Sequence, residues 1–413
     1  MLKTLLVGID VHSEKNSCAF TDEQGNRLIK KAFSLSNNLP GAEELVKRIE
    51  SAMQEGAFDK LMIATEASSF LDLHLVDYLS NSKSLNRYLP LIYQFNPKLT
   101  AGLKKVYADI DKSDDIDPFV IADRLRFGHL PEPYEDSKAY FPLKRLTRYR
   151  CHLVNTIARE KNYFLTHLFL KFSSFSSLKP FSNTFGKTSL AVITDFLSVD
   201  EIVAMPIEEL VDFIVKQGKN RFNNPEQIAE AVNKVARESY RLRPSLANSV
   251  NLILGSTLQN IRALCASLKE VDEAIAQEFK GFPNTLESVK GLGPVYAAGI
   301  FVELGNIERF SSQAKVAKFA GLTWRKRQSG KHESEITRMT KTGNRYLRYY
   351  LVEAANSLRV HNEEYKAYYQ KKYNEVTKHR HKRAVALTAR KLVRLVFALL
   401  TKRHLWQPLN GSF

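Results

Sequence analysis

Residues 4–10 read Thr-Leu-Leu-Val-Gly-Ile-Asp, an apolar and β-branched run that carries a single carboxylate. A run of this length and composition predicts a buried β-strand. We expect Asp10 to lie in the middle of that strand, where an unpaired charge is costly to bury. We therefore interpret Asp10 as a functional carboxylate rather than as an acid at a strand end.

Two more strands are predicted directly after this one. Residues 16–22 and 27–34 alternate apolar and polar positions, and a turn-like Asp-Glu-Gln-Gly-Asn lies between them. This pattern indicates a hairpin, so three antiparallel strands open the chain. Pro40 then begins a helical pattern, and residues 60–65 form another buried-type strand that ends at Glu66.

Helices and strands continue to alternate downstream of Glu66. The periodicity predicts a helix over 70–80, a strand over 89–95, and helices over 97–107 and 115–128. The resulting order, β-β-β-α-β-α-β-α, is that of the RNase H-like (RuvC-like) fold. In that fold, acids from the first strand, the fourth strand and a late helix converge at one end of the sheet.

An acid-dense segment, Asp109 to Asp117, enters the last of these helices. Asp114 and Asp117 are three residues apart, so on a helix they share a face. With Asp10 and Glu66 they form a set of hard oxygen ligands, which suits Mg²⁺ or Mn²⁺. Two such ions can activate one oxygen and stabilise the leaving oxygen at a phosphodiester.

Some of these acids also have a simpler interpretation. Glu66 equally fits a surface acid before a loop, and helix starts favour acids in any case. Pro118 suits the first helical position, which would make Asp117 an N-cap residue. A residue before proline also avoids helical backbone angles, which bears on the geometry of Asp117.

The middle of the chain is predicted to be helical. Residues 137–172 form a basic amphipathic stretch, 173–190 have no period and indicate a loop, and 224–238 and 245–280 are again helical. We interpret 137–283 as a coiled-coil-like helical arm or spacer. A long antiparallel helical pair would suit contacts between subunits, although simple packing explains it equally.

A different, mainly α-helical unit begins at residue 284. Gly291-Leu292-Gly293-Pro294 lies between helical patterns, and Ser311 is expected to cap a short helix. Gly291 and Gly293 would let the backbone approach a phosphate, and the next helix offers free N–H groups. This is a helix-hairpin-helix-like pattern, although a tight turn without a ligand fits as well.

Ser329 lies in a basic stretch that we expect to be irregular, Trp-Arg-Lys-Arg-Gln-Ser-Gly-Lys-His over 324–332. A serine hydroxyl is a weak nucleophile until a base or nearby cations activate it. Arg325, Arg327 and Lys331 flank it, and the following glycine leaves room for a phosphate. Judged by spacing alone, a Ser-Gly pair in a basic loop is more often an ordinary turn.

The cationic surface continues beyond this loop. Helices rich in Arg and Lys are predicted over 344–360 and 363–403, and the basic run 378–383 is expected to contact phosphate. We expect four further cations to form one helix face along a nucleic-acid backbone: Arg338, Lys341, Arg345 and Arg348.

Charge is distributed unevenly along the 413 residues, which carry a net charge of +17. Residues 1–140 sum to −4, residues 141–290 to +5 and residues 291–413 to +16. A basic block this concentrated usually faces a polyanion, most commonly nucleic acid. The pattern indicates a division of labour between metal-binding carboxylates and phosphate-binding cations.

Other classes of protein are disfavoured. The three cysteines are far apart and fit neither a zinc pattern nor a disulfide framework. We find neither a secretory signal nor an apolar run of membrane length. We expect a cytoplasmic protein without a membrane partner, divided into an α/β catalytic domain (1–136), a helical arm (137–283) and a basic domain (284–413).

Taken together, the motifs resemble the insertion-sequence 110 family of transposases, which are relatives of the Piv-type DNA invertases. At one end the resemblance is carried by Val-Gly-Ile-Asp-Val-His (7–12), Thr-Glu-Ala-Ser (65–68) and Lys-Ser-Asp-Asp-Ile-Asp (112–117). At the other it is carried by Gly-Leu-Gly-Pro (291–294), Phe-Ala-Gly-Leu (319–322), Ser-Gly-Lys (329–331) and residues 336–348. The middle matches only as a helical spacer, and Pro118 departs from the family's usual alanine.

The resemblance implies a specific chemistry. The family's four-acid site corresponds to Asp10, Glu66, Asp114 and Asp117, and its nucleophilic serine to Ser329. It implies DNA strand cleavage and exchange through a phosphoserine link, on donor and target DNA, guided by a structured noncoding bridge RNA. It also implies a homo-oligomer, dimer to tetramer, in which the first domain of one subunit meets the serine domain of another.

Two alternatives stay open. One is a structure-selective nuclease of the Holliday-junction resolvase type, which would use the same acids with water as nucleophile; the basic serine domain disfavours it. The other is a non-catalytic nucleic-acid-binding protein with a degenerate first domain, which the presence of all four acids disfavours.

Overall fold

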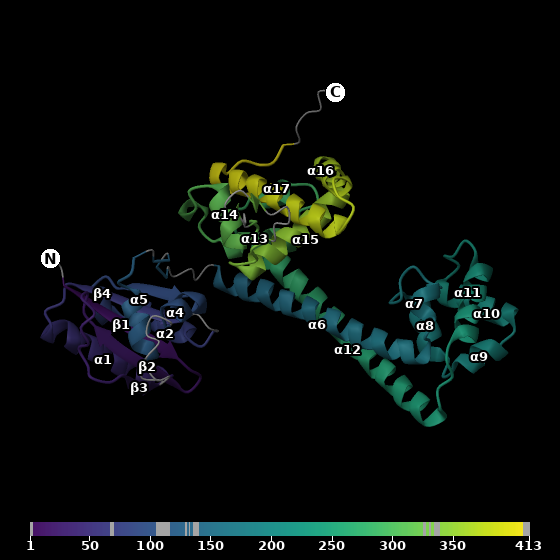
Figure 1. Ribbon diagram of the computed structural model, residues 1–413, viewed down its shortest axis with the longest axis horizontal. Coiled ribbons are helices and arrows are strands. Elements are labelled where there is room, and N and C mark those ends of the chain that lie inside the picture. Colours follow the sequence, from purple (N-terminus) through teal and green to yellow (C-terminus); the bar gives the residue numbers. More distant parts are fainter. Residues whose placement is uncertain are drawn as a thin grey trace. The chain divides into compact units, whose positions relative to one another are not determined.

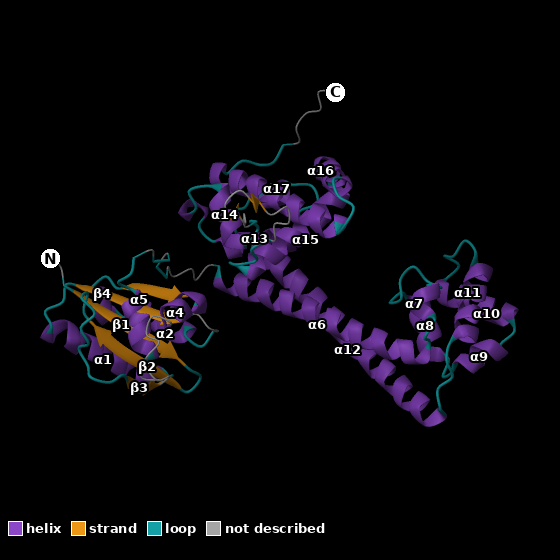
Figure 2. Ribbon diagram, viewed as in Figure 1, coloured by secondary structure: helices purple, strands orange, loops and turns teal. Residues whose placement is uncertain are grey.

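The computed structural model describes residues 3–66, 70–104, 116–128, 130–131, 133–134, 140–324, 328–329, 332–333 and 339–407. The chain forms two compact units, Met1–Lys138 and Ala139–Phe413. The first contains a β-sheet, whereas the second is almost entirely helical (Figure 1, Figure 2). No helix within the described residues is long and apolar enough to cross a membrane.

The first unit is built on a five-stranded sheet of order β3-β2-β1-β4-β5. Strands β1 and β2 are antiparallel, as are β2 and β3, whereas β4 and β5 run parallel to β1. The three antiparallel opening strands are therefore confirmed. The bounds are Thr4–Val11, Lys15–Thr21, Phe33–Ser36, Lys60–Glu66 and Leu91–Phe95.

The third strand is shorter and later than the sequence predicts. It was expected over 27–34, but β3 is Phe33–Ser36, and Arg27 makes only an isolated bridge to Thr21. Lys30 and Lys31 are both exposed. Two successive exposed residues break the alternation that a half-buried strand requires, so the chain leaves the ladder there.

Helices cover both faces of the sheet. Leu5, Val7 and Ile9 of β1 pack in one core with helices α1 and α2, whereas Leu6 packs in a second core with α5. The predicted helix over 70–80 is α2, and the short α3 follows it. The helices of this unit are α1 Leu39–Glu55, α2 Leu73–Ser80, α3 Lys83–Asn86, α4 Pro97–Lys104 and α5 Asp117–Arg124.

Gly8 sets how closely α5 approaches the sheet. A Cβ at this position would overlap the carbonyl oxygen of Pro118 and the backbone nitrogen of Ala122. Both atoms belong to the α5 backbone, which cannot rotate away as a side chain can. Only glycine therefore allows α5 to lie directly on β1.

Two long helices form the spine of the second unit, α6 (Phe141–Lys171) and α12 (Pro244–Phe279), and Figure 1 shows them side by side. Leu143 near the start of α6 shares a core with Phe279 at the end of α12. Leu168, near the end of α6, shares another with α12 residues such as Leu254. The pair is therefore antiparallel, and each end belongs to a separate hydrophobic core.

The core at the end of α6 includes a stretch that the sequence predicts to be a loop. Residues 173–190 contain α7 (Phe175–Leu178) and the start of α8 (Lys187–Asp195). Phe172 and Phe175 are buried, and Phe181 and Phe185 pack against the same core. The aromatic residues of this segment follow no regular spacing, so periodicity does not predict that it packs in a core. Three further helices complete this core: α9 Val199–Ala204, α10 Ile207–Gly218 and α11 Pro225–Glu238.

The other core joins the ends of the spine to the C-terminal helices. The single helix expected over 363–403 is two helices, α16 and α17. The short helix expected after Ser311 is α14, and its N-cap is Ser312, which has the extended backbone of an N-cap residue. The elements are η2 Leu286–Ser288, α13 Pro294–Leu304, η3 Ile307–Arg309, α14 Gln313–Ala320, α15 Arg345–His361, α16 Glu363–Asn374 and α17 Arg380–Lys402.

The close contact at Gly8 is testable by adding one methyl group. Gly8→Ala should lower the free energy of unfolding of the first unit by about 1–3 kcal/mol, because α5 must retreat from β1. Gly102→Ala is the matched control, since nothing lies within 4 Å of a Cβ at that position in α4. It should leave stability unchanged or raise it by up to about 1 kcal/mol. Equal urea-unfolding curves for the two variants would contradict the packing role of Gly8.

Candidate functional site

Asp10 is the second-last residue of β1, so the expectation of a mid-strand position is wrong. The strand continues by one residue, and Asp10 pairs with Ser17 of β2 near the carboxyl end of β1. Its side chain is 15% exposed, and its Oδ2 lies 3.2 Å from Nε2 of His12. A position at a strand end lets the carboxylate reach solvent while the strand fixes its backbone.

Glu66 is the last residue of β4 and stands beside Asp10. The parallel register pairs Ile9 with Thr65, so the next residues along the two strands are Asp10 and Glu66. Oε1 of Glu66 accepts a hydrogen bond of 2.8 Å from the hydroxyl of Thr100, which is fully buried in α4. A charged acceptor makes this hydrogen bond stronger than a neutral one and fixes the carboxylate.

A buried carboxylate, Asp72, ties the strand ends together on the opposite side of this pair. Its Oδ2 accepts from Thr65 Oγ1 at 2.9 Å and from Gln94 Nε2 at 2.8 Å. Thr65 and Gln94 are register partners on β4 and β5. The network holds the carboxyl end of β4, and with it the backbone of Glu66. Sequence reasoning missed Asp72 and Thr100, because their partners become neighbours only in the folded chain.

Asp117 is the first residue of α5, so it is not the N-cap residue that the alternative interpretation of Pro118 suggested. Ile116 occupies the cap position, and Pro118 follows within the first turn, where its missing N–H costs nothing. Alternate residues share a strand face, so Gly8 and Asp10 face the same way. Because Pro118 lies on Gly8, Asp117 begins its helix over the face that carries Asp10.

Three of the four predicted acids are therefore brought to one face at one end of the sheet. Asp114, the fourth, lies outside the described residues. Among the residues that are described, no three Asp, Glu, His or Cys side chains lie close enough together to hold a metal ion. The donor chemistry nevertheless fits a hard cation, since the face offers carboxylate oxygens on neighbouring elements with backbones fixed by the sheet.

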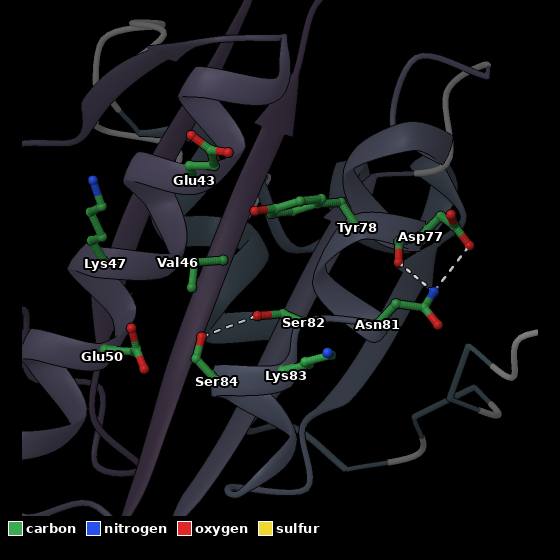
Figure 3. Close-up of a pocket in the computed structure, with 10 residues that line it drawn as sticks. All are labelled: Glu43, Val46, Lys47, Glu50, Asp77, Tyr78, Asn81, Ser82, Lys83 and Ser84. Carbon is green, nitrogen blue, oxygen red and sulfur yellow. Dashed lines mark hydrogen bonds between the residues drawn. The ribbon is translucent and has the colours of Figure 1, made fainter.

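The first unit also carries a cavity of about 730 Å³ against α1, α2 and α3, the helices of the other core (Figure 3). Figure 3 shows Glu43, Lys47 and Glu50 along α1, facing Tyr78 of α2. The residues that line the cavity include both acids and lysines. Among them, the Asp77 carboxylate accepts a hydrogen bond from the Asn81 amide at 3.3 Å. The cavity is separate from the face that carries Asp10.

Ser329 lies on a short β-hairpin, where the sequence predicts irregular chain. Strands β6 (Gln328–Ser329) and β7 (His332–Glu333) are antiparallel, with Ser329 paired to His332. Two-residue strands are too short for periodicity to reveal. Thr323 and Thr340 lie on either side of the hairpin in the sequence. The Thr340 N–H donates to the Thr323 carbonyl at 2.8 Å, and the hydroxyls of these two residues lie 3.1 Å apart.

Several predicted phosphate ligands cannot be placed beside that serine. Arg325, Arg327, Lys331 and Arg338 lie outside the described residues.

The expectation that four cations lie on one helix face is wrong. Helix α15 begins only at Arg345, because Gly343 and Lys341 adopt left-handed backbone angles before it. Arg345 stacks on Tyr346, with its guanidinium carbon 4.7 Å from the ring centre. Arg348 donates to the Ala320 carbonyl at 2.9 Å, at the end of α14, and burial lowers the pKa of its guanidinium.

The two predicted glycines have different surroundings. Gly291 has a φ of +94°, its carbonyl accepts from Ser357 Oγ at 2.8 Å, and a Cβ there would lie 2.9 Å from the Cβ of His361. Gly293 caps α13 and has open space around it. The element before them is the three-residue 3-10 helix η2, so the segment departs from two α-helices joined by a hairpin.

A buried glutamate, Glu303 of α13, connects three helices of the second unit. It accepts from Arg148 of α6 at 2.6 and 3.0 Å and from the Asn344 amide at 2.7 Å. Asn344 in turn caps α15 by accepting from the N–H groups of Tyr346 and Leu347. Three helices therefore meet at one carboxylate. A lone acid within an apolar helix is the signal that could have revealed it.

Two family models match the chain. One, described as a transposase and specific for the IS110-type DEDD domain, matches residues 7–172. The other, described as the transposase IS116/IS110/IS902 family, matches residues 284–370. The two matches include all four predicted acids and Ser329.

Relatives from two bacterial insertion elements are similar over most of their length. An uncharacterised 44.8 kDa protein of insertion element IS116 from Streptomyces clavuligerus is 24% identical over 73% of this chain and 74% of its own. An uncharacterised 42 kDa protein of insertion element IS900 from Mycobacterium paratuberculosis is 23% identical over the same shares. With a five-stranded α/β domain consistent with the RNase H-like fold, these matches show that the chain belongs to the IS110 family of transposases.

Proposed function

We propose that this transposase cuts and exchanges DNA strands through a metal-dependent reaction with Ser329 as nucleophile. The observation that carries the proposal is the convergence of Asp10, Glu66 and Asp117 on one face at one end of the sheet. A cation bound at this face would offset the repulsion between neighbouring carboxylates such as Asp10 and Glu66.

In this proposal Asp10, Glu66, Asp114 and Asp117 hold Mg²⁺ or Mn²⁺. When bound, such an ion neutralises charge on the scissile phosphate and promotes loss of a proton from the attacking hydroxyl. Thr100 orients the Glu66 carboxylate, and Asp72 fixes the strand end behind it. Rigid support of this kind keeps ligands in place through the reaction.

Ser329 would break the strand by direct attack. Its Oγ forms a bond to phosphorus as a bond from phosphorus to a DNA oxygen breaks, and the serine proton leaves to solvent or base. A free DNA 3′-hydroxyl then attacks the phosphoserine link and releases Ser329. The number of phosphodiester bonds is conserved, so no ATP is required. Arg327 and Lys331 are our first choices for holding the phosphate.

DNA is the partner that the family implies, and we propose two others. A noncoding bridge RNA would pair with donor and target DNA. Subunits would assemble into a homo-oligomer, dimer to tetramer, in which the acid domain of one chain serves the serine domain of another. We place this reaction in the cytoplasm, at the nucleoid.

The acid assignments predict metal-dependent cleavage. Asp10→Asn and Glu66→Gln should abolish strand cleavage in Mg²⁺ or Mn²⁺, as should excess chelator, because each removes ligand charge or the ion itself. DNA binding, measured by gel shift, should change little. Glu55→Gln, an exposed position on α1, is the control and should cleave normally. Full cleavage in chelator would rule out the carboxylate site.

Thr100 offers a graded test of the same site. Thr100→Val keeps the shape but removes the donor to Glu66, so cleavage should fall about 10–100-fold and require more Mg²⁺. Thr100→Ser retains the hydroxyl and should recover most of the activity. If Val and Ser variants cleave alike at all Mg²⁺ concentrations, the hydrogen bond has no role in the reaction.

Ser329 should leave a covalent trace. Stalling the reaction on a nicked substrate and denaturing it should yield protein joined to DNA, with the adduct on the peptide that contains Ser329. Ser329→Ala should abolish adduct and strand exchange with little loss of stability, because a small polar side chain on a two-residue strand contributes little to it. Ser311→Ala and Ser334→Ala are the controls. Normal exchange by Ser329→Ala would instead support the nuclease that uses water.

A further inference from the structure

The helical hairpin formed by α16 and α17 carries a cluster of tyrosines and cations that the proposed reaction does not use. Residues 359–383 contain four tyrosines and eight lysines and arginines against three glutamates. The family model ends at residue 370, so the second half of this segment lies beyond it. Contacts within the cluster involve both helices.

Two tyrosines of α16 pack against each other with tilted rings. The ring centres of Tyr369 and Tyr373 are 5.8 Å apart, and both rings are partly exposed. The Tyr369 hydroxyl lies 2.8 Å from Nδ1 of His381 on α17, which ties the two helices together. The guanidinium groups of Arg359 and Arg380 lie 5.1 and 5.6 Å from Tyr369 and Tyr373. These rings are therefore fixed before any ligand arrives.

The cations exceed the acids that could neutralise them. Glu363 pairs with Lys366, Glu364 with Lys391, and Glu375 with both Lys372 and Arg383. Three exposed lysines keep no acidic partner among the described residues: Lys371, Lys378 and Lys382.

Basic residues also crowd the start of α17. Its first turn holds Arg380, His381, Lys382 and Arg383 and no acid. Cations at a helix N-terminus oppose the helix dipole. Glu375 offsets Arg383, and an anion beside Arg380 and Lys382 would offset the charge that remains.

We propose that the surface formed by Tyr369, Tyr373, Lys378, Arg380 and Lys382 binds single-stranded DNA. Tyrosine rings stack on bases that are unpaired, and the surrounding cations contact the phosphates between them. A duplex hides its base faces, so the tyrosines would contribute little to binding one. DNA is the nucleic acid on which the family acts, and separated strands expose the bases that the rings require. The proposal depends on this partner but not on the metal or serine chemistry.

The test is binding of a labelled 20-nucleotide oligo-dT by the full chain in chelator, measured by fluorescence anisotropy. The double variant Tyr369→Leu, Tyr373→Leu should bind at least about tenfold more weakly, with an unchanged salt slope. Lys378→Gln with Lys382→Gln should bind more weakly and reduce the slope of log affinity against log salt by about 1.4. The second pair is exposed, so its result does not depend on tolerance of the core.

Matched controls come from the same unit. Tyr240→Leu replaces a tyrosine that is 79% exposed, and Lys187→Gln with Lys216→Gln replaces two exposed lysines outside the surface; all should bind as the parent does. Parental affinity in both the tyrosine and the lysine variants would overturn the proposal. So would equal losses for duplex DNA, or a preference for oligo-U that the tyrosine substitutions erase, which would assign the surface to RNA. Because chelator suppresses cleavage, failure here is distinct from failure of the proposed reaction.

Discussion

The buried carboxylate of Glu303 is the constraint on which the second unit depends. Its side chain is fully buried, and an unpaired charge in such a place would cost several kcal/mol. Arg148 and Asn344 satisfy it from two other elements, and Asn344 also caps α15. The long helix α6, the apolar helix α13 and the start of α15 are thus held together by one ionic network.

In the first unit the corresponding constraint is steric. Gly8 allows the α5 backbone to lie on β1, and Asp10 follows two residues later on the same face. Carboxylates that share a metal repel one another before it binds, so their positions must be imposed by the surrounding structure. Strand ends and a helix start impose them better than loops would, because their backbones are fixed by the sheet's hydrogen bonds.

How much the sequence reveals depends on the range of the interaction. The apolar run around Asp10, the strand before Glu66 and the two spine helices follow from periodicity, which is local. The donor from Thr100, the tie at Asp72 and the role of Gly8 could not be predicted, because each partner is distant in sequence. The segment after Phe172 was predicted to be a loop since its aromatic residues follow no regular spacing. Lys171 is a similar case: its ammonium donates to the carbonyls of Ile193 and Phe196, and burial lowers its pKa to about 8.

Asp10 and Glu303 carry the same sequence signal but have different surroundings. Both are lone acids in apolar segments, yet one reaches solvent at a strand end and the other is enclosed by an arginine and an amide. The difference lies in the partners. Glu303 is neutralised by the fold itself, so it stabilises the structure, whereas Asp10 stands beside Glu66 and His12. Carboxylates that stand side by side at strand ends, rather than in a core beside an arginine, are those whose mutual repulsion a bound cation would offset.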